Sequence, residues 1–261
     1  MTYQYPDKQD RLTCQLIEEV NTGNYWEESE QAVLKACLQR LEGRNDHRVL
    51  DLGCGLGRLL PVMAPYASAV TGAEPDPERC GLAQILAPQA VQKAAPDCDC
   101  RIINGDVANV EVQGRGPFDV VLSSHVVQHI PFSLTKSMLS GATKLLNPGG
   151  WLFLTTTNGN DADSFTLEYM GENGQRVSEK TDEQGFTGAF GREGVLPVAF
   201  YAAEKMQKLF DGLGLDCCEI LGYHYTAQKA DLSAEEDARL NAAGDRRAAR
   251  DILYICRKRE G

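Results

Sequence analysis

The chain of 261 residues has no excess of basic charge. Its 26 Lys and Arg residues are outnumbered by 37 Asp and Glu residues, which gives a formal net charge of −11. An acidic surface repels the phosphates of nucleic acids and of anionic lipids. Positive charge clusters only at Arg257, Lys258 and Arg259. We therefore expect no nucleic-acid partner.

Long hydrophobic runs are also missing. The segment from Met1 to Leu12 is polar and charged, and no stretch elsewhere has the length and apolarity of a signal peptide or a membrane-spanning helix. We expect a cytoplasmic protein without a membrane partner. Hydrophobic residues make up 43% of the chain and charged residues 24%, which is ordinary for a globular protein that buries a full core.

The cysteines lack the paired spacing of a structural metal site. There are nine of them, an odd number that does not fit a disulfide framework. Cys98-x-Cys100 and the adjacent Cys217 and Cys218 are not CxxC pairs. We expect reduced thiols and no bound metal, with a thiol-reactive site as the alternative.

What the sequence does contain is an alternation of short apolar strands and amphipathic helices. The strands are predicted at 48–51, 69–74, 100–104, 118–123 and 151–155, with a terminal pair at about 218–225 and 251–256. The helices are predicted between Ser29 and Gly43 and at 59–67, 78–86, 134–145 and 203–213. This order predicts an α/β fold with parallel strands and right-handed crossovers.

A glycine-rich loop follows the first predicted strand. It contains Gly53, Gly55 and Gly57, which let the backbone turn sharply and approach a ligand at a helix N-terminus. A dinucleotide fingerprint places a small residue at position 58, where this chain has Arg58, and avoids an acid such as Asp51. A Walker A loop would need Gly-Lys-Ser/Thr. Both phosphate-binding interpretations are therefore disfavoured.

Three acids lie at the ends of three successive predicted strands. Asp51 follows the first strand and favours a cationic group such as an ammonium or a sulfonium. Glu74 ends the second strand, where a carboxylate can accept both ribose hydroxyls. Asp106 follows the third and can accept a hydrogen bond from an adenine amine, or it can simply cap the turn. The set suits an uncharged nucleoside with a cationic tail.

In this order, five segments of the chain resemble the class I S-adenosylmethionine-dependent methyltransferases, which have a Rossmann-like fold. The segments are VLDLGCGLGR at 49–58, GAEPD at 72–76, GD at 105–106, FDVVLSSHVVQHIP at 118–131 and LLNPGG at 145–150. The resemblance covers about residues 48–156. It implies a doubly wound, mostly parallel seven-stranded sheet with helices on both faces and an antiparallel last strand.

The resemblance also implies S-adenosylmethionine as the cofactor and a set of residues that hold it. Asp51 and Gly53 would hold the methionine part, Glu74 the ribose, and Asp106 with Val107 the adenine. The remaining residues of the expected cofactor site are Cys54, Gly55, Arg58, Pro75 and Ser123.

The acceptor side is less sharply defined. His125 follows the fourth strand, where ligands bind in this fold class, and it either serves as a general base or lines the acceptor pocket. A dedicated base is optional because methyl transfer is a direct displacement that alignment alone accelerates. Further candidates for lining the acceptor pocket are Tyr25, Trp26, His129, Tyr169, Tyr201 and His224.

Two segments lie outside the alternating pattern. Residues 1–44 are expected to form an N-terminal helical cover, and residues 45–261 the Rossmann-like methyltransferase domain. Within that domain the pattern lapses at about 157–200, and an insertion of this length predicts an acceptor-side lid. The insertion carries eight acids, which favours a neutral or cationic acceptor, although a solvated loop explains them nearly as well.

Taken together, the sequence predicts methyl transfer from S-adenosylmethionine to an oxygen or nitrogen of a small-molecule acceptor, by a monomer or homodimer. The alternatives are a protein or peptide methyltransferase and a non-catalytic S-adenosylmethionine-binding subunit. The acceptor itself does not follow from the sequence.

Overall fold

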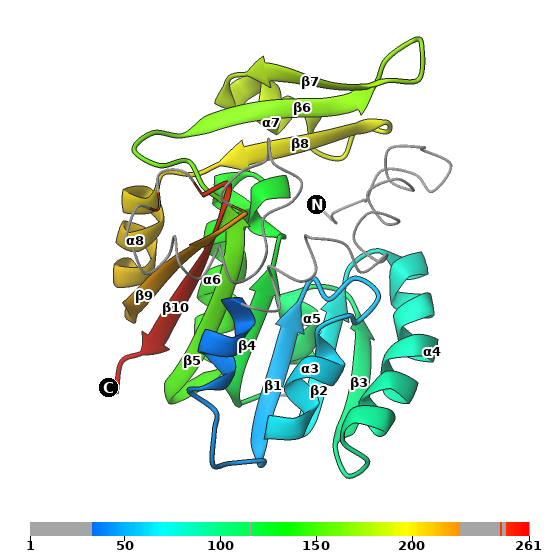
Figure 1. Cartoon of the computed structure of the whole chain (residues 1–261), viewed down its shortest axis with the longest axis vertical. Coiled ribbons are helices and arrows are strands. Elements are labelled where there is room, and N and C mark those ends of the chain that lie inside the picture. Colours follow the sequence, from blue (N-terminus) through cyan, green and yellow to red (C-terminus); the bar gives the residue numbers. More distant parts are fainter. Residues whose placement is uncertain (1–32, 115, 225–245, 247–248, 261) are drawn as a thin grey trace.

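A seven-stranded sheet forms the centre of the molecule (Figure 1). The computed structural model describes residues 33–114, 116–224, 246 and 249–260. The strand order is β3-β2-β1-β4-β5-β10-β9. The strands are β1 (His47–Leu52), β2 (Ala67–Glu74), β3 (Asp99–Asn104), β4 (Phe118–Ser124), β5 (Leu146–Thr157), β9 (Leu215–Tyr223) and β10 (Asp251–Lys258).

The first five strands of this sheet are parallel, and one strand runs against its neighbours. β1 pairs in parallel with β2 and β4, β2 with β3, and β4 with β5. β10 is antiparallel to both β5 and β9. The expected mostly parallel, seven-stranded sheet is confirmed. Because of these directions, the carboxyl ends of β1, β2, β4, β5 and β9 and the start of β10 lie along one edge, which we call the carboxyl edge.

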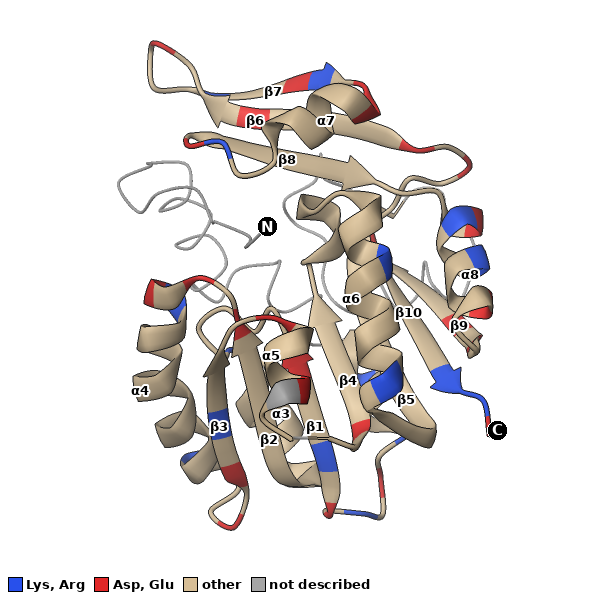
Figure 2. Cartoon of the chain, turned by 180° about the vertical axis from the view of Figure 1, so that it is seen from behind, with Lys and Arg blue, Asp and Glu red and all other residues tan. Residues whose placement is uncertain are grey.

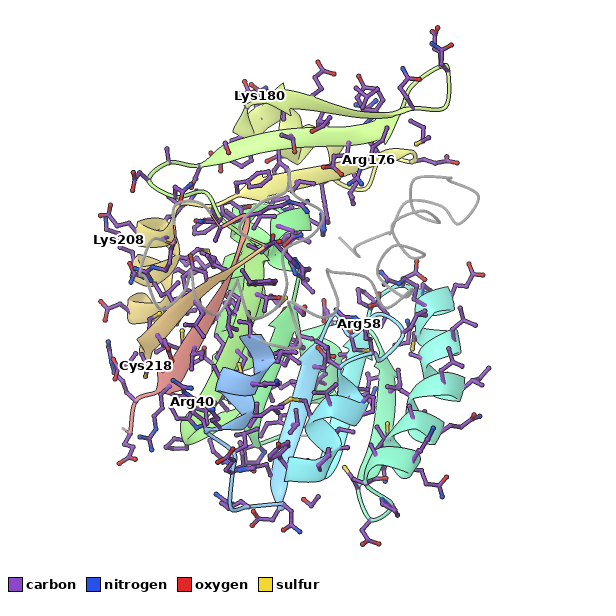
Figure 3. The ribbon with its side chains drawn as sticks, in the orientation of Figure 1. Arg40, Arg58, Arg176, Lys180, Lys208 and Cys218 are labelled. Carbon is purple, nitrogen blue, oxygen red and sulfur yellow. The ribbon has the colours of Figure 1, made fainter. Side chains whose placement is uncertain are left out.

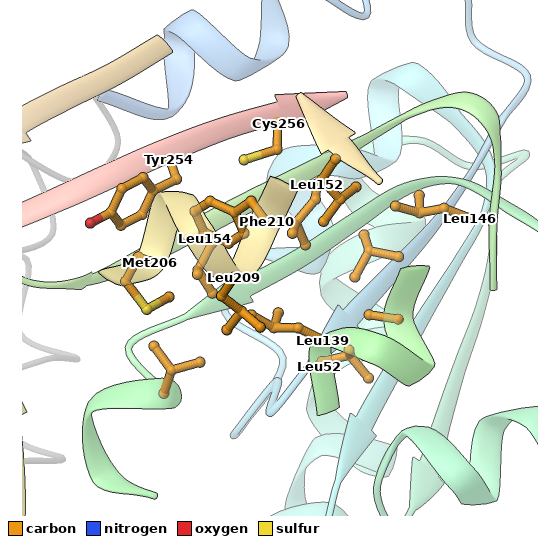
Figure 4. Packing of buried hydrophobic residues seen from close by; sticks show 14 of the residues in the cluster. Leu52, Leu139, Leu146, Leu152, Leu154, Met206, Leu209, Phe210, Tyr254 and Cys256 are labelled. Atoms are coloured by element: carbon orange, nitrogen blue, oxygen red, sulfur yellow. The ribbon is translucent and has the colours of Figure 1, made fainter. Parts of the chain in front are cut away.

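Helices cover both faces of the large sheet, as expected. They are α3 (Leu60–Met63), η1 (Ala64–Tyr66), α4 (Pro77–Ala94), α5 (Val107–Val112), η2 (Val127–His129), α6 (Phe132–Leu145) and α8 (Ala203–Gly212). One core cluster joins α6 and α8 to the sheet through residues such as Leu139, Phe210 and Tyr254 (Figure 4). The other joins α3 and α4 to the sheet, and it includes Leu60 and Val91.

The described part of the expected N-terminal cover belongs to this second cluster. Residues 33–38 are helical, and Val33, Leu34, Cys37 and Leu41 are buried against the sheet. Their role is packing, because they contribute to the core rather than to the carboxyl edge. The segment before residue 33 lies outside the described residues, so a cover over the acceptor stays a prediction.

Several element boundaries differ from those predicted. The helix predicted over 59–67 is only α3 and η1, and Ala67 already begins β2 by pairing with His47. The helix predicted to end at Leu86 continues to Ala94 with Pro88 inside it. α5 was not predicted, because its six residues are too few to display a helical period.

The insertion forms regular structure that its sequence pattern did not predict. β6 (Ser164–Met170) pairs antiparallel with β7 (Arg176–Thr181) and with β8 (Val195–Phe200), and α7 (Glu183–Ala189) lies between β7 and β8 in the chain. We call these three strands the small sheet. Figure 1 shows it beyond the carboxyl edge of the large sheet.

The small sheet is fastened to the large one. Phe165, Phe186 and Tyr201 belong to the same buried cluster as α6 and α8. The hydroxyl of Tyr201 donates to the carbonyl of Ile130 at 3.0 Å, and the backbone N–H of Ala202 donates to Asp163 Oδ1 at 2.8 Å. Shared burial of aromatic side chains and these bonds fix the position of the small sheet relative to the carboxyl edge.

No helix among the described residues combines the length and the apolar character needed to cross a membrane. Figure 2, the view from behind, shows Lys and Arg interspersed with Asp and Glu rather than gathered into one band over the elements drawn there.

The N-cap of α4 provides a test of the fold next to the glycine loop. Asp76 Oδ1 accepts from the backbone N–H groups of Glu78 and Arg79, at 3.0 and 2.8 Å. Replacing an N-cap Asp by Ala typically costs about 1 kcal/mol. We expect Asp76→Ala to lower the free energy of unfolding in urea by about that amount. The exposed Asp161 provides the control, and Asp161→Ala should change it by less than about 0.5 kcal/mol.

Candidate functional site

The glycine loop turns back over the end of β2. Gly53, Gly55 and Gly57 have φ angles of 75°, 57° and 83°, in the left-handed region that favours glycine. A Cβ atom at Gly53 would lie 2.3 Å from Val126 Cγ2, so this position has no room for a side chain. The N–H groups of Gly53 and Cys54 both donate to the carbonyl of Ala73, at 2.8 and 3.1 Å. The loop is thus held against β2 by its own backbone.

Two buried carboxylates lie at the same place. Asp51 and Glu74 are each only 2% exposed, at the ends of β1 and β2. Glu74 Oε2 accepts from the N–H of Gly55 at 2.9 Å, and its Oε1 accepts from the N–H of Asp76 at 3.0 Å. Burial raises the pKa of the Glu74 carboxyl, and the nearby Arg79 and these two N–H groups oppose the rise.

The two carboxylates and the loop beside them fit the expected cofactor. Two buried acids beside the glycine loop disfavour a phosphate and favour a cationic group. A carboxylate oxygen that accepts one N–H still has acceptor capacity for a hydroxyl, so the bonds of Glu74 to the loop are compatible with a ribose. The structure therefore brings Asp51, Gly53, Gly55 and Glu74 together at one place, and their contact with a cofactor stays a prediction.

The other expected cofactor residues have different surroundings. Cys54 is buried, and burial raises the pKa of its thiol, which keeps it protonated. Pro75 is half-buried directly after β2. Arg58 is also half-buried, and Figure 3 shows it at the carboxyl edge beside the glycine loop.

Asp106 caps a helix. Its Oδ1 accepts from the N–H groups of Ala108 and Asn109, and the Asn109 side chain accepts from the N–H of Asp106 at 2.9 Å, which completes a capping box. This is the capping role that the sequence left open, and the contact with adenine stays a prediction. Val107 packs against the core cluster of α6.

Ser123 ties two strands together. Its side chain is fully buried, and its hydroxyl donates to the carbonyl of Leu52 at 3.1 Å. This bond links β4 to β1 below the glycine loop. The structure thus gives Ser123 a structural role rather than an exposed face toward a cofactor.

His125 sits at the end of β4 with both ring nitrogens engaged. Its φ angle of 53° is unusual for a residue other than glycine. Its Nδ1 lies 3.1 Å from Gln128 Oε1, and its Nε2 lies 2.7 Å from the Tyr223 hydroxyl. The ring is half-buried, whereas Tyr223 is fully buried.

A second histidine lies behind Tyr223. The rings of Tyr223 and His224 are 4.6 Å apart, and His224 Nδ1 is 2.6 Å from Asp251 Oδ2. Burial alone would raise the pKa of the Asp251 carboxyl, but the bond to His224 and the nearby His125 lower it below its usual value. His224 is 2% exposed, so it supports the site from within rather than lining a pocket.

The remaining acceptor candidates are spread over the small sheet and its attachment. His129 Nδ1 is 2.9 Å from the carbonyl of Pro197, which joins η2 to β8. Tyr201 is fully buried with its hydroxyl bound to Ile130, so it packs in the core. The Tyr169 hydroxyl donates to Glu179 within the small sheet at 3.0 Å. Tyr25 and Trp26 lie outside the described residues.

Acids of the insertion have structural partners. Asp163 pairs with Lys205, Glu168 pairs with Arg176, and Asp182 caps α7 through the N–H of Gly185. Glu179 accepts from Tyr169. These contacts give four of the eight acids a structural role, which weakens the indication of a cationic acceptor.

Sequence reasoning missed Gln128, Tyr223 and Asp251. Gln128 and Tyr223 contact His125 directly, and Asp251 contacts His224. Gln128 lies three residues from His125, which was a usable signal. Tyr223 and Asp251 come from distant strands, and only the strand order brings them to the carboxyl edge.

Comparison with known proteins matches most of this chain to one family model, described as a methyltransferase domain, over residues 25–220. Among curated relatives, a ubiquinone biosynthesis O-methyltransferase of Paracidovorax citrulli is 33% identical over 51% of this chain and 52% of that protein. The protein of the same name from Vibrio parahaemolyticus is 27% identical over 74% of this chain and 73% of that protein. The chain spans about half the length of the first of these relatives.

Among solved structures, a SAM-dependent methyltransferase from Archaeoglobus fulgidus superposes with a TM-score of 0.57. The sequences are 16% identical, and the superposition covers 94% of this chain and 99% of that one. At this identity the likeness is one of fold.

The attachment of the small sheet predicts a pH-dependent stability. Burial lowers the pKa of His129 from 6.5 to about 4, so the native state keeps this ring neutral while the unfolded state takes up a proton below about 6.5. The free energy of unfolding should therefore fall as pH drops from about 6.5 to about 4, by about 2 kcal/mol after allowance for partial solvent access.

The matched variant is His129→Gln, which keeps an N–H donor for Pro197 but cannot titrate. Urea unfolding of both proteins between pH 7.5 and 4.5 measures the effect. The variant should lose less stability than the wild type over this range, and parallel profiles would show that His129 carries no such linkage.

Proposed function

The chain belongs to the methyltransferase domain family, and from this premise we propose that it transfers a methyl group from S-adenosylmethionine to a hydroxyl oxygen of a small-molecule acceptor. The observation that carries the proposal is the pair of buried acids, Asp51 and Glu74, beside the glycine loop at the carboxyl edge. The methyltransferase family, expected from the sequence, is confirmed. S-adenosylmethionine as the cofactor is part of the proposal, and the name of the Archaeoglobus fulgidus neighbour supports it.

Residues of the first two strands would hold the cofactor. S-adenosylmethionine supplies a methyl group on a positively charged sulfur, which makes its carbon open to direct displacement. Asp51 provides negative charge toward the cationic tail, Glu74 accepts from the ribose hydroxyls, and the half-buried backbone at Gly53 carries no side chain that would block the loop. Arg58, Pro75, Asp106 and Val107 complete the proposed set.

Oxygen is favoured over nitrogen as the methylated atom by the relatives. Those described above are O-methyltransferases of ubiquinone biosynthesis, and their name states that the methylated atom is oxygen. A small acceptor is also supported by the small sheet, which is fastened beyond the carboxyl edge through His129, Tyr201 and Phe165. We propose that this sheet is the acceptor-side lid of a monomer or homodimer.

His125 is the proposed proton acceptor. It lies at the end of β4 on the same edge as Asp51, and the Val126 side chain next to it contacts the glycine loop at Gly53. A hydroxyl attacks a methyl carbon faster as it loses its proton, and a positioned imidazole can take that proton. Alignment of the acceptor supplies the rest of the acceleration.

The cofactor site is tested by removing one buried charge. Calorimetric titration with S-adenosylmethionine and S-adenosylhomocysteine should show binding of both by the wild type and no response to NAD. Asp51→Asn keeps the side-chain size but loses the charge, and we expect its affinity for S-adenosylmethionine to fall about 10- to 100-fold. The matched control is Asp119→Asn, at the amino end of β4, which should bind normally. Equal affinity of both variants and the wild type would contradict the assignment of Asp51.

The proton acceptor is tested with His125→Asn. Asn tolerates the positive φ of this position and stays polar, but it cannot take up a proton. With catechol as the acceptor, we expect kcat to fall about 100-fold or more while the affinity for S-adenosylhomocysteine is unchanged. An unchanged kcat would leave His125 as a lining residue only. If the wild type forms no S-adenosylhomocysteine with phenols, amines or peptides, the result favours a non-catalytic subunit. If it turns over peptides alone, the result favours a protein methyltransferase.

A further inference from the structure

The two nitrogens of the His125 ring differ in what they can do. An imidazole that is neutral carries its proton on one nitrogen and its lone pair on the other, and the neighbouring groups decide which. Only the nitrogen with the lone pair can act as a base. The contacts of His125 with Gln128 and Tyr223 settle the assignment.

Gln128 presents an oxygen to Nδ1. The same Oε1 atom lies 3.3 Å from the backbone N–H of Thr157, which can only donate, so this atom of the amide must be the acceptor. Since an oxygen in this role cannot donate to Nδ1, Nδ1 must carry the proton and donate to Gln128 at 3.1 Å. Gln128 is 7% exposed, so water does not readily replace it.

The lone pair is therefore on Nε2, where the Tyr223 hydroxyl donates at 2.7 Å. The Tyr223 ring is fully buried and meets the His125 ring edge-on, with centroids 6.0 Å apart. Its hydroxyl can rotate and accept a hydrogen bond from Nε2 once that nitrogen is protonated, because a phenol is both donor and acceptor. Tyr223 thus accommodates both protonation states of the ring.

We propose that Gln128 is a positioning residue for the transfer reaction: it fixes His125 as the Nδ1–H tautomer and so assigns proton uptake to Nε2, on the side of Tyr223. The role of Gln128 in catalysis rests on the proposed function, whereas the tautomer of His125 does not. During transfer the acceptor oxygen forms a bond to the methyl carbon, and the carbon–sulfur bond breaks with its electron pair on sulfur. The acceptor's proton reaches Nε2 through the Tyr223 hydroxyl, which passes its own proton to Nε2 as it takes up that of the acceptor. The resulting imidazolium returns the proton to solvent, while the Nδ1–H bond to Gln128 stays intact.

Other titratable groups lie around the ring. Asp251 on β10 and His129 on η2 interact electrostatically with His125, and His224 lies behind Tyr223. Variants at Gln128 leave these groups in place, so a change in titration would come from position 128 itself.

Two variants separate positioning from packing. Gln128→Leu removes the acceptor from both Nδ1 and Thr157, whereas Gln128→Glu keeps an oxygen for both and adds a negative charge. Nitrogen-15 NMR of histidine-labelled protein, without cofactor or acceptor, reports the tautomer and the titration of each of the four histidines. The His125→Asn variant identifies the signal of His125.

We expect a single Nδ1–H tautomer in the wild type and in Gln128→Glu, and an appreciable Nε2–H population in Gln128→Leu. The titration of His125 in Gln128→Glu should move upward by about 1 to 3 pH units, because a carboxylate favours the imidazolium. With catechol, at a pH above this raised titration, kcat should fall about tenfold or more in Gln128→Leu with little change in KM, and Gln128→Glu should retain the rate.

A single Nδ1–H tautomer in Gln128→Leu would overturn the inference, and so would equal losses of rate in the two variants. The tautomer is measured without turnover, so failure of the wild type to methylate catechol would count against the proposed function alone. Thermal melts of both variants exclude a general loss of folding as the cause of a changed rate.

Discussion

The glycine loop depends on one buried carboxylate. Glu74 ends β2 and accepts the N–H of Gly55 with one oxygen and the N–H of Asp76 with the other, so it joins the loop to the start of α4. Burying a charged group is costly unless hydrogen bonds compensate for lost water. Here the compensation comes from the very backbone that shapes the proposed cofactor site. The buried carboxylate and the loop backbone therefore stabilise each other.

The parallel sheet determines what this loop can cooperate with. Because β1, β2 and β4 run in the same direction, their ends bring Asp51, Glu74 and His125 to one edge. The antiparallel β10 begins where the other strands end, which adds Asp251, and β9 adds Tyr223. Residues that are far apart in the chain thus meet around the His125 ring.

The small sheet adds a second level of organisation. It has its own antiparallel hydrogen bonding, yet its aromatic side chains Phe165 and Phe186 join the main core. His129 connects it to the turn that follows His125, through Pro197. The turn carrying His125, Gln128 and His129 consequently has one residue directed to β9, one to β5 and one to the small sheet. Because His129 lies four residues after His125, a shift of β8 at Pro197 would displace the turn that carries the proposed base.

The sequence by itself determined the α/β class, the five parallel strands, the glycine loop and the two acids beside it. These features rest on local signals, namely alternating apolar periods and residues that a strand–loop–helix unit needs at adjacent positions. For Asp106 the sequence left two roles open, a contact with adenine and a cap of the following turn. Only the tertiary structure decided that Asp106 caps α5, that Ser123 and Tyr201 bond within the core, and that the insertion is a sheet. Likewise, the partners of His125 on β9 and η2 could not be found from the chain alone, because hydrogen bonds between distant strands depend on strand order and register, which no local pattern encodes.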